Sequence, residues 1–233
     1  MERSDKEVKE YAYLARYYDL LLGDKEAFSY WLHYIEEEDF RTCLELASGS
    51  GVMAGILKEK GYQVIASDIS TEMKEAAADN FDGEYLILDM SDLKIEGSYD
   101  LILCICDSIN YLYEEELEGM FKGVYEHLNQ GGRFIFDMHS PQRLEEFSEE
   151  YIEEGQLDEN TFYQWTIDSD RDDRTLNEHF TFYTPEGMIQ EHHTQNVFDS
   201  DTVRNRMENA GFTTRVIEDF IEDEKILVIG KKQ

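Results

Sequence analysis

The sequence has few prolines and few cysteines, and each shortage narrows what the chain can be. Only Pro141 and Pro185 are proline among its 233 residues, and no glycine- or serine-rich linker divides it. We therefore expect one domain with an insertion rather than two tethered domains. The three cysteines, Cys43, Cys104 and Cys106, lie in apolar runs, and their number is odd. This usage is typical of reduced thiols in a cytosol and argues against a disulfide framework.

Basic residues are also few in comparison with acidic ones. The chain has 21 basic and 53 acidic residues, which gives a formal net charge of −32. We expect no nucleic-acid partner, because nucleic acids are bound by Lys and Arg side chains that displace counterions from the phosphates. No apolar run approaches the length of a membrane span, and the N-terminus leads into no apolar segment of the signal-peptide kind. These absences predict a cytoplasmic protein with no membrane partner.

Strand patterns alternate with helical patterns through most of the chain. Strands that are apolar on both faces and alternate with helices indicate a parallel sheet covered by helices on both sides. The last two strands are joined by a short acidic turn, which favours antiparallel pairing. The expected strands are residues 42–46, 63–67, 85–88, 99–105, 133–137, 214–220 and 225–230, and the expected helices are 52–60, 70–80, 114–128 and 201–209. The sequence thus predicts an α/β fold with a seven-stranded, mostly parallel sheet.

Two segments depart from this alternation. Apolar residues recur at helical spacing over 5–38, with a break at Gly23-Asp24 and a second helix from Ala27 to Glu37. Residues 161–168, 175–184 and 188–198 have the pattern of a half-exposed antiparallel sheet. This sheet could roof a small-molecule pocket or form a homodimer interface, because its edges need cover. The expected organisation is a helical lid (1–40), an α/β core (41–140), an inserted antiparallel β subdomain (141–198) and a final helix with the closing hairpin (199–233).

A glycine-containing loop stands between the first core strand and its helix. Gly49 and Gly51 would let the backbone approach a ligand closely, and the helix N-terminus offers free N–H groups. Asp68 closes the next strand, at a distance along the chain that suits a carboxylate bound to ribose hydroxyls. This pattern fits either a dinucleotide or S-adenosylmethionine (SAM).

The run Leu-Glu-Leu-Ala-Ser-Gly-Ser-Gly at 44–51 resembles the first motif of class I methyltransferases, acid-x-Gly/Ala-Cys-Gly-Thr-Gly, with serine at 48 and 50. The resemblance covers nearly the whole chain. Residues 68–69 resemble the ribose motif and 88–90 the adenine motif, while 11–19, 106–112 and 136–141 are similar to a bacterial group of small-molecule methyltransferases. The inserted strands resemble those of sugar and glycine-type N-methyltransferases. The resemblance implies a Rossmann-like fold and methyl transfer from SAM to an N or O atom of a small-molecule acceptor, with S-adenosylhomocysteine as product.

The resemblance also implies a set of cofactor-binding residues. The Ala47 carbonyl and Gly49 backbone would meet the methionine end of SAM, and Asp68 would bind the ribose. Ile69 and Met90 would enclose the adenine, with Asp89 accepting from its amino group. The whole set is Tyr11, Tyr18, Glu45, Ala47, Gly49, Gly51, Asp68, Ile69, Asp89, Met90 and Cys106, in which the two tyrosines belong to the lid and Cys106 lies beneath the methyl group.

Catalysis requires a general base only if the acceptor arrives protonated, because the sulfonium is already activated. Two candidates follow the carboxyl ends of strands, Asp107 and His139. His139 titrates near neutrality, although it could instead only stabilise the loop before Pro141. Trp165, with Tyr163 or Tyr183, could line an acceptor pocket or pack the inserted sheet. We expect no metal site, because His192 and His193 are neighbours on a strand and face opposite ways.

Two other functions fit part of the pattern. An NAD-dependent oxidoreductase would use a similar loop, but the chain lacks the Tyr-x-x-x-Lys pair of the short-chain type. A SAM-binding regulator or scaffold without catalysis would share every cofactor residue. Binding of S-adenosylhomocysteine rather than NAD(H) distinguishes a methyltransferase from the oxidoreductase. Methylation of an acceptor distinguishes it from the non-catalytic SAM-binding protein.

Overall fold

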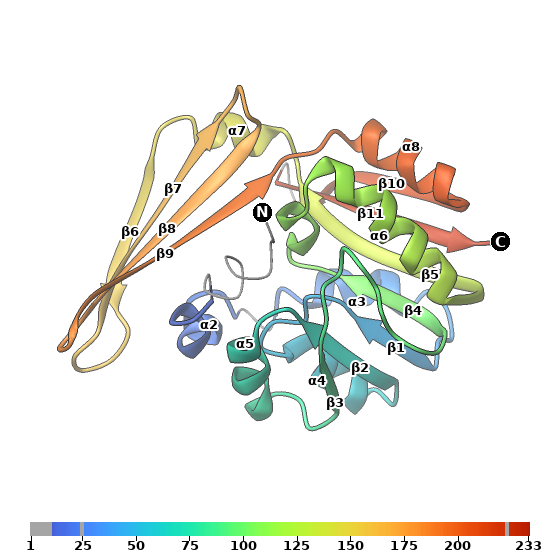
Figure 1. Cartoon of the computed structure of the whole chain (residues 1–233), viewed down its shortest axis with the longest axis horizontal. Coiled ribbons are helices and arrows are strands. Elements are labelled where there is room, and N and C mark those ends of the chain that lie inside the picture. The colour runs from blue at the N-terminus through green and yellow to red at the C-terminus, as the bar shows by residue number, and fades with distance from the viewer. Residues whose placement is uncertain (1–10, 24–25, 222–223) are drawn as a thin grey trace.

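The computed structural model describes residues 11–23, 26–221 and 224–233, which form two sheets (Figure 1). The larger sheet has seven strands in the order β10-β11-β5-β4-β1-β2-β3. β1 to β5 are parallel to one another, and β11 pairs antiparallel with both β5 and β10. The strands are β1 (Thr42–Glu45), β2 (Gln63–Asp68), β3 (Glu84–Ile87), β4 (Tyr99–Cys104), β5 (Leu128–His139), β10 (Phe212–Ile221) and β11 (Lys225–Lys232). This arrangement confirms the predicted seven-stranded, mostly parallel sheet.

Helices cover both faces of this sheet, which explains why its central strands are apolar throughout. On β4, Leu101 and Leu103 pack toward one face with α3 (Ser29–Ile35) and α4 (Val52–Glu59). Ile102 and Cys104 pack toward the other face with α6 (Glu114–His127) and α8 (Ser200–Ala210). All four side chains are fully buried. Burial on both faces removes apolar surface from water in two layers, and this is the main contribution to the stability of such a sheet.

The smaller sheet is inserted between β5 and α8 and extends to one side of the core in Figure 1. It consists of β6 (Tyr151–Gln156), β7 (Phe162–Asp170), β8 (Thr175–Thr184) and β9 (Gly187–Asn196), all antiparallel. Its inner face buries Phe180 and Phe182 against Leu14, which lies in the turn η1 (Leu14–Arg16) next to α2 (Tyr18–Leu21). The predicted antiparallel insertion is therefore present, and its inner face packs on the N-terminal segment.

Several boundaries differ from the sequence prediction. The strand β6 was not predicted, because it is an edge strand whose alternate positions are exposed and mostly charged or polar. The single helix expected up to Gly23 is, in its described part, the short turn η1 followed by the four-residue α2, and its residues 5–10 lie outside the described residues. The helix expected over 70–80 is α5 (Thr71–Ala76) continued by η2 (Ala77–Asp79). β5 is longer at both ends than expected and reaches His139.

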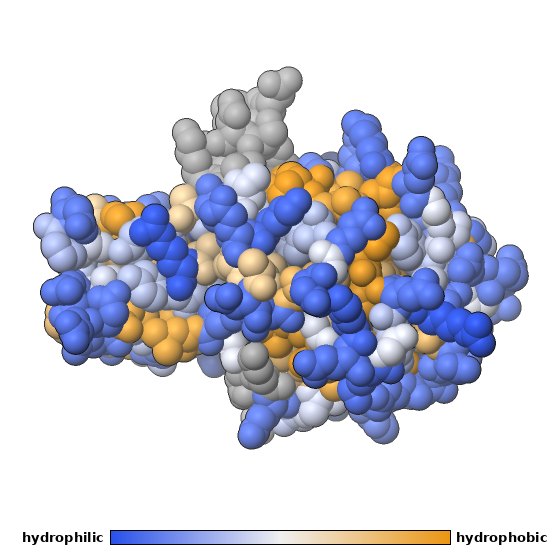
Figure 2. Space-filling view, turned by 90° about the horizontal axis from the view of Figure 1, so that it is seen from below, coloured by the Kyte–Doolittle hydropathy of each residue, from blue (hydrophilic) through white to orange (hydrophobic). Residues whose placement is uncertain are grey.

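Two short elements complete the connections to the site. η3 (Ser108–Tyr111) follows β4, and α7 (Gln142–Glu146) leads from β5 into the inserted sheet. Among the residues that the structure describes, no helix has the length and apolar composition that crossing a bilayer requires. Figure 2, which views the molecule from below, shows hydrophilic side chains over much of that side, in agreement with the acidic composition.

Candidate cofactor and acceptor site

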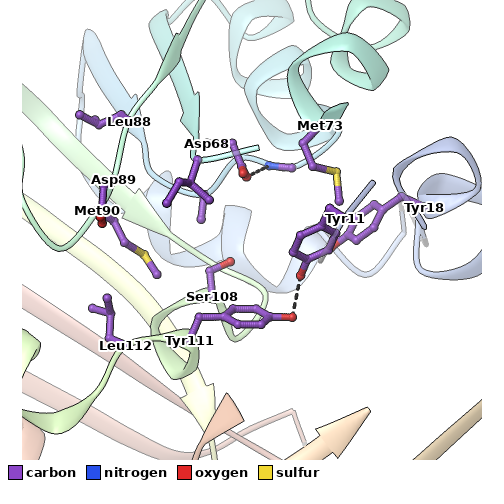
Figure 3. A pocket seen from close by; sticks show the side chains of 13 residues that line it. Tyr11, Tyr18, Asp68, Met73, Leu88, Asp89, Met90, Ser108, Tyr111 and Leu112 are labelled. Carbon is purple, nitrogen blue, oxygen red and sulfur yellow. Dashed lines mark hydrogen bonds between the residues drawn. The ribbon is translucent and has the colours of Figure 1, made fainter. Parts of the chain in front are cut away.

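A cavity opens at the carboxyl ends of the parallel strands, where open α/β sheets bind ligands. It has a volume of about 700 Å³, including the open space at its mouth. In Figure 3, Leu88, Asp89 and Met90 lie on one side of it, and Tyr11 and Tyr18 lie on the other. The full lining is Tyr11, Tyr18, Ala47, Gly49, Asp68, Ile69, Met73, Leu88, Asp89, Met90, Ser108, Tyr111 and Leu112. Eight of the eleven predicted cofactor residues thus share one cavity.

The glycine loop forms one wall of this cavity. Ala47 and Gly49 both have left-handed backbones, with φ of 49° and 55°. A Cβ at Gly49 would lie 3.8 Å from the Tyr18 ring, so a side chain there would occupy space between the loop and the lid. The Tyr85 hydroxyl donates to the Gly49 carbonyl at 2.6 Å and holds the loop from below. Glycine is therefore favoured at 49 by its left-handed backbone angle, whereas a Cβ there would make only ordinary van der Waals contact with Tyr18.

Asp68 lies at the end of β2, beside this loop. Its carboxylate accepts from the N–H of Gly49 at 3.0 Å, the bond drawn at Asp68 in Figure 3, and from the N–H of Ser70 at 2.9 Å. Burial raises the pKa of Asp68, and these backbone donors partly oppose that shift. An ionised carboxylate has about four acceptor positions, so two remain for a ligand. This leaves Asp68 able to accept from two vicinal hydroxyls.

Apolar side chains and a second carboxylate occupy the other end of the cavity. Ile69, Leu88, Met90 and Leu112 supply apolar surface suited to a flat ring. One oxygen of Asp89 accepts from the N–H and hydroxyl of Ser91 at 2.8 and 2.7 Å. An apolar slot between two carboxylates suits a nucleoside, whose base needs apolar contact and whose ribose and amino group donate hydrogen bonds. The residues present therefore fit the adenosyl part of SAM.

The N-terminal segment connects the glycine loop to the inserted sheet. Asp19 in α2 accepts from the Ser50 hydroxyl and, at 2.6 Å, from the Asn80 amide. Glu191 of β9 accepts from the backbone N–H groups of Tyr13 and Leu14. The segment from Tyr11 to Leu22 thus lies over the cofactor cavity and is held at both ends.

A second cavity adjoins the first and is enclosed by the core, the lid and the inserted sheet. It has a volume of about 1360 Å³ including its mouth, and Tyr11, Tyr18, Ser108 and Tyr111 line both cavities. The predicted residues Cys106, Asp107, His139 and Trp165 line the second cavity. Tyr163 and Tyr183 do not, so of the three aromatic residues considered only Trp165 takes this place. Glu178, His193 and Gln195 also line it and were not predicted, because they are scattered over β8 and β9 with no motif of their own.

Two of these unpredicted residues, His193 of β9 and Glu178 of β8, show which side of the inserted sheet faces the second cavity. His193 is buried, with its ring 4.6 Å from that of Tyr11, whereas His192 is exposed and pairs with His179 on the outer face. The two neighbouring histidines do face opposite ways, as predicted. Glu178 accepts from the Trp165 indole at 3.1 Å. A carboxylate from the inserted sheet therefore faces the same cavity as Asp107 from the core.

Asp107 and His139 face each other inside the second cavity. Asp107 Oδ1 lies 3.5 Å from His139 Nδ1, and neither atom has a hydrogen-bond partner among the described residues. Asp107 Oδ2 accepts from Lys225 Nζ at 2.6 Å. Burial alone would raise the pKa of Asp107, but His139 and Lys225 together lower it to about 2. Burial also lowers the pKa of His139 below its usual 6.5, so the ring is neutral near pH 7.

The buried carboxylate of Asp137 stabilises the arrangement of Asp107 and His139. Asp137 accepts from the backbone N–H groups of Cys106 and Asp107 at 2.8 and 3.1 Å. It also accepts from the Trp31 indole at 2.8 Å and from Lys225 at 3.2 Å. Cys106 and Asp107 both have φ of 59°, a left-handed backbone that costs non-glycine residues about 1–3 kcal/mol each. Asp137 was not predicted, although an aspartate inside an otherwise apolar strand is a signal that could have found it.

Replacing Asp137 by alanine is expected to lower the free energy of unfolding by about 3–5 kcal/mol, since it leaves three buried N–H donors without their acceptor and Lys225 with Asp107 as its remaining carboxylate partner. Urea denaturation followed by circular dichroism measures this loss. Asp137→Asn should lose less, because its carbonyl oxygen still accepts from the Trp31 indole or a backbone N–H. The exposed Asp39→Ala is the control for charge alone and should leave the midpoint unchanged. An equally small effect at both positions would contradict this account of the network.

Two predicted cofactor residues line neither cavity. Glu45 is buried behind the loop, where it accepts from the Ser48 hydroxyl at 2.7 Å. Burial raises its pKa to about 8. Gly51 has φ of 75°, and a Cβ there would approach Ala77 and Phe81 to 3.1 Å, so it serves the packing of the loop against η2 and Phe81. Their direct contact with the cofactor stays a prediction.

Comparison with known proteins agrees with this geometry. Residues 43–132 match the family described as "Methyltransferase domain". The protein YqeM of Bacillus subtilis (strain 168), provisionally named a methyltransferase, is 29% identical over 92% of this chain and 91% of its own length. The chain is a class I SAM-dependent methyltransferase. The inserted sheet and the N-terminal elements belong to the same fold in solved structures of such enzymes.

Two solved structures illustrate this shared fold. A SAM-dependent methyltransferase from Clostridium acetobutylicum ATCC 824 superposes with a TM-score of 0.77 and 24% identity, covering 93% of this methyltransferase and 96% of that chain. SAM-bound CalS10, an amino pentose methyltransferase from Micromonospora echinaspora, superposes with a TM-score of 0.67 and 17% identity over the whole of both chains. The predicted methyltransferase function is confirmed, and the dehydrogenase alternative finds no support in these matches.

Proposed function

We propose that this methyltransferase transfers the methyl group of SAM to a nitrogen or oxygen atom of a small molecule bound in the second cavity. The observation that carries the proposal is the shared wall of the two cavities. Because Tyr11, Tyr18, Ser108 and Tyr111 line both, a ligand in the first cavity and a ligand in the second would meet at these residues. Proximity and alignment are the main contributions that a protein makes to such a displacement.

The first cavity supplies the cofactor contacts in this proposal. Asp68 accepts from the ribose hydroxyls, Asp89 accepts from the adenine amino group, and Ile69 and Met90 contact the base. SAM, when bound, supplies a methyl group already activated by a positive sulfonium. Tyr11 and Tyr18 exclude water from the place where the two cavities meet, and Cys106 forms part of its floor.

The second cavity suits an acceptor that donates hydrogen bonds. Asp107 and Glu178 present carboxylates to it, and His139 presents a ring nitrogen that has no hydrogen-bond partner among the described residues. Trp165 and Phe180, stacked with ring centroids 5.2 Å apart, supply apolar surface for the rest of the molecule. An amine or hydroxyl compound fits this combination. CalS10 acts on an amino pentose, a small molecule of this kind.

In this proposal His139 accepts the proton that the methyl acceptor loses, and Asp107 assists it. As the new carbon–nitrogen or carbon–oxygen bond forms, the carbon–sulfur bond breaks, and the proton of the acceptor atom passes to Nδ1 of His139. The negative charge of Asp107 stabilises the imidazolium that results. Lys225, fixed by Asp137, orients Asp107 so that its second oxygen faces His139.

The remaining predictions concern partners and place in the cell. The outer face of the inserted sheet carries a row of exposed apolar residues, Phe162, Tyr183 and Met188, which are paired across three strands. A homodimer through this face stays a prediction that light scattering in solution can check. The cytoplasmic location and the lack of a nucleic-acid partner also stay predictions.

The proposed function is tested by incubating the protein with SAM and a panel of amine and hydroxyl metabolites, and searching by mass spectrometry for products heavier by one methylene. The expected result is a product that forms with the wild type and with the exposed Asp79→Ala control, but not with Asp68→Ala. Binding of NAD(H) without binding of S-adenosylhomocysteine would contradict the cofactor assignment. Methylation confined to macromolecules would contradict the small-molecule acceptor.

A further inference from the structure

Gln195 connects the inserted sheet to His139 through a pair of hydrogen bonds whose direction is determined. Its amide Nε2 lies 3.4 Å from the backbone carbonyl of Asp107, and its Oε1 lies 2.8 Å from His139 Nε2. A backbone carbonyl can only accept, so the amide nitrogen must face Asp107 and the amide oxygen must face His139. Both Gln195 and His139 are buried, with 4% and 5% of their surface exposed.

This direction selects one form of the His139 ring. The Gln195 oxygen has no hydrogen to donate, so His139 Nε2 must carry the proton. In a neutral imidazole only one nitrogen is protonated, so Nδ1 is left with a free electron pair. That nitrogen faces Asp107 Oδ1 at 3.5 Å, which places two acceptors opposite each other with no hydrogen between them.

The backbone around both residues is held by two asparagines. Asn110 in η3 accepts from the backbone N–H of His139 at 3.1 Å and donates to the carbonyl of Asn196 at 2.6 Å. The Asn196 side chain donates to the Leu112 carbonyl at 3.0 Å. Because Asn196 follows Gln195 directly, these bonds anchor the end of β9 to the core beside His139. The distance between Gln195 and His139 therefore depends on buried contacts and not on a loose loop.

We propose that Gln195 is a positioning residue that keeps the free electron pair of His139 on Nδ1, and that the N–H or O–H of the methyl acceptor binds between this nitrogen and Asp107 Oδ1. The inference rests on the proposed role of His139 in methyl transfer. A donor placed there would satisfy both orphan acceptors at once, and the same contact would aim the electron pair of the acceptor atom toward the cofactor cavity. The inserted sheet thus contributes to the chemistry as well as to the walls of the pocket.

Several charged groups act on His139 besides Gln195. Asp107 from the core favours the protonated ring, while Lys225 from β11 and Arg143 from α7 oppose it. Glu178 and His193 line the same cavity from β8 and β9. None of these groups contacts Nε2 of His139 in the described part of the chain, so substitution at Gln195 changes that hydrogen bond and leaves the others in place.

The test measures the ring of His139 directly, using full-length protein labelled with ¹³C,¹⁵N-histidine. Nitrogen chemical shifts distinguish a protonated ring nitrogen from a bare one, and the His139→Asn variant identifies the signal among six histidines. The wild type should show a neutral ring protonated on Nε2. Gln195→Leu removes the acceptor, so the proton should move to Nδ1, where it can bond to Asp107. Methyl transfer to the acceptor found in the metabolite screen should then fall by at least about 100-fold, the lower end of the range for a lost general base.

Gln195→Glu supplies the opposite change. A carboxylate next to Nε2 favours the charged ring and should raise the pKa of His139 by about one unit or more. Because the protonated ring cannot accept a proton, the acid limb of kcat/KM should move to higher pH by the same amount. Gln190→Leu, on the exposed outer face of the same strand, is the matched control and should change neither the tautomer nor the profile.

The outcomes separate this inference from the proposed function. Protonation of Nδ1 in the wild type, or an unchanged tautomer in Gln195→Leu, would overturn the role of Gln195 whatever the activity. A changed tautomer with an unchanged rate would overturn the placement of the acceptor at His139. Titration of the same samples with S-adenosylhomocysteine reports cofactor binding independently, so failure of the methyltransferase function itself would be visible there.

Discussion

Replacing Asp68 by alanine is expected to weaken binding of S-adenosylhomocysteine by about 100-fold or more. Two hydrogen bonds from ribose hydroxyls to a buried carboxylate contribute about 1.5–3 kcal/mol each, and about 1.4 kcal/mol corresponds to a tenfold change in affinity. The substitution also removes the acceptor for the Gly49 and Ser70 N–H groups, which loosens the loop that borders the cofactor. Isothermal titration calorimetry with S-adenosylhomocysteine measures the effect without an acceptor.

Two further variants keep this result interpretable. Asp68→Asn retains one carbonyl oxygen for the backbone and should lose about tenfold, since its amide nitrogen can no longer accept from a hydroxyl. Asp79→Ala removes the same charge from an exposed position and should bind as the wild type does. A thermal melt of each variant shows whether the fold is retained. Full affinity in a folded Asp68→Ala protein would refute the ribose assignment.

Replacing His139 by alanine is expected to lower kcat by about 10²–10⁴, the range typical of a lost general base. S-adenosylhomocysteine affinity should stay unchanged, because His139 does not line the first cavity. The pH profile gives a second readout. Burial lowers the pKa of His139, so the neutral base persists on acidification and the acid limb of kcat/KM should lie below pH 6.5. Activity should then fall as the pH drops through that lowered pKa.

The matched control for this variant is His192→Ala. His192 lies on the exposed face of β9, next to the buried His193. It should leave kcat and the profile as they are. Asp107→Asn keeps an acceptor for Lys225 but removes the charge that stabilises the protonated ring, so it should also lower kcat. If His139→Ala is as fast as the wild type while Asp107→Asn is slow, the base is Asp107. Full rates in both variants would show that the acceptor arrives already deprotonated.

The core elements could be predicted from local patterns, and the exceptions have physical causes. Leu101 to Cys104 are apolar on both faces because helices cover both sides of β4, and this leaves a signature in four consecutive residues. β6 leaves none, because an edge strand with one partner buries little. The N-terminal segment is apolar at helical spacing, yet Tyr11, Leu14 and Tyr17 contact the inserted sheet from a short turn. The spacing of apolar residues indicates which positions are buried. It does not distinguish a regular helix from a short turn that packs between two sheets.

The lining of the candidate cofactor cavity could be predicted where its residues are connected by a short stretch of chain. Gly49 lies in the loop after β1 and Asp68 ends the adjacent strand β2 of the same βαβ unit, so the chain connection itself places them together. The second cavity has no such connection. Gln195, His139 and Lys225 come from β9, β5 and β11, and no local pattern relates them. Their meeting depends on which edge of the core the inserted sheet covers.

The sequence by itself therefore determined the class of fold and, through a resemblance that starts from residues 44–51 and covers nearly the whole chain, the family and the cofactor that it implies. Only the tertiary structure decided how the candidate base is arranged. Asp137 accepts from the backbone N–H of Cys106, where the chain is left-handed. Lys225 donates to one oxygen of Asp107. Gln195 accepts from His139 and so determines which ring nitrogen carries the proton. The physical reason is the range of the interactions. The periodic burial of a helix or strand leaves a pattern in neighbouring residues of the sequence. A buried hydrogen-bond network forms only where segments distant in the sequence come together and exclude water, so it leaves no such pattern.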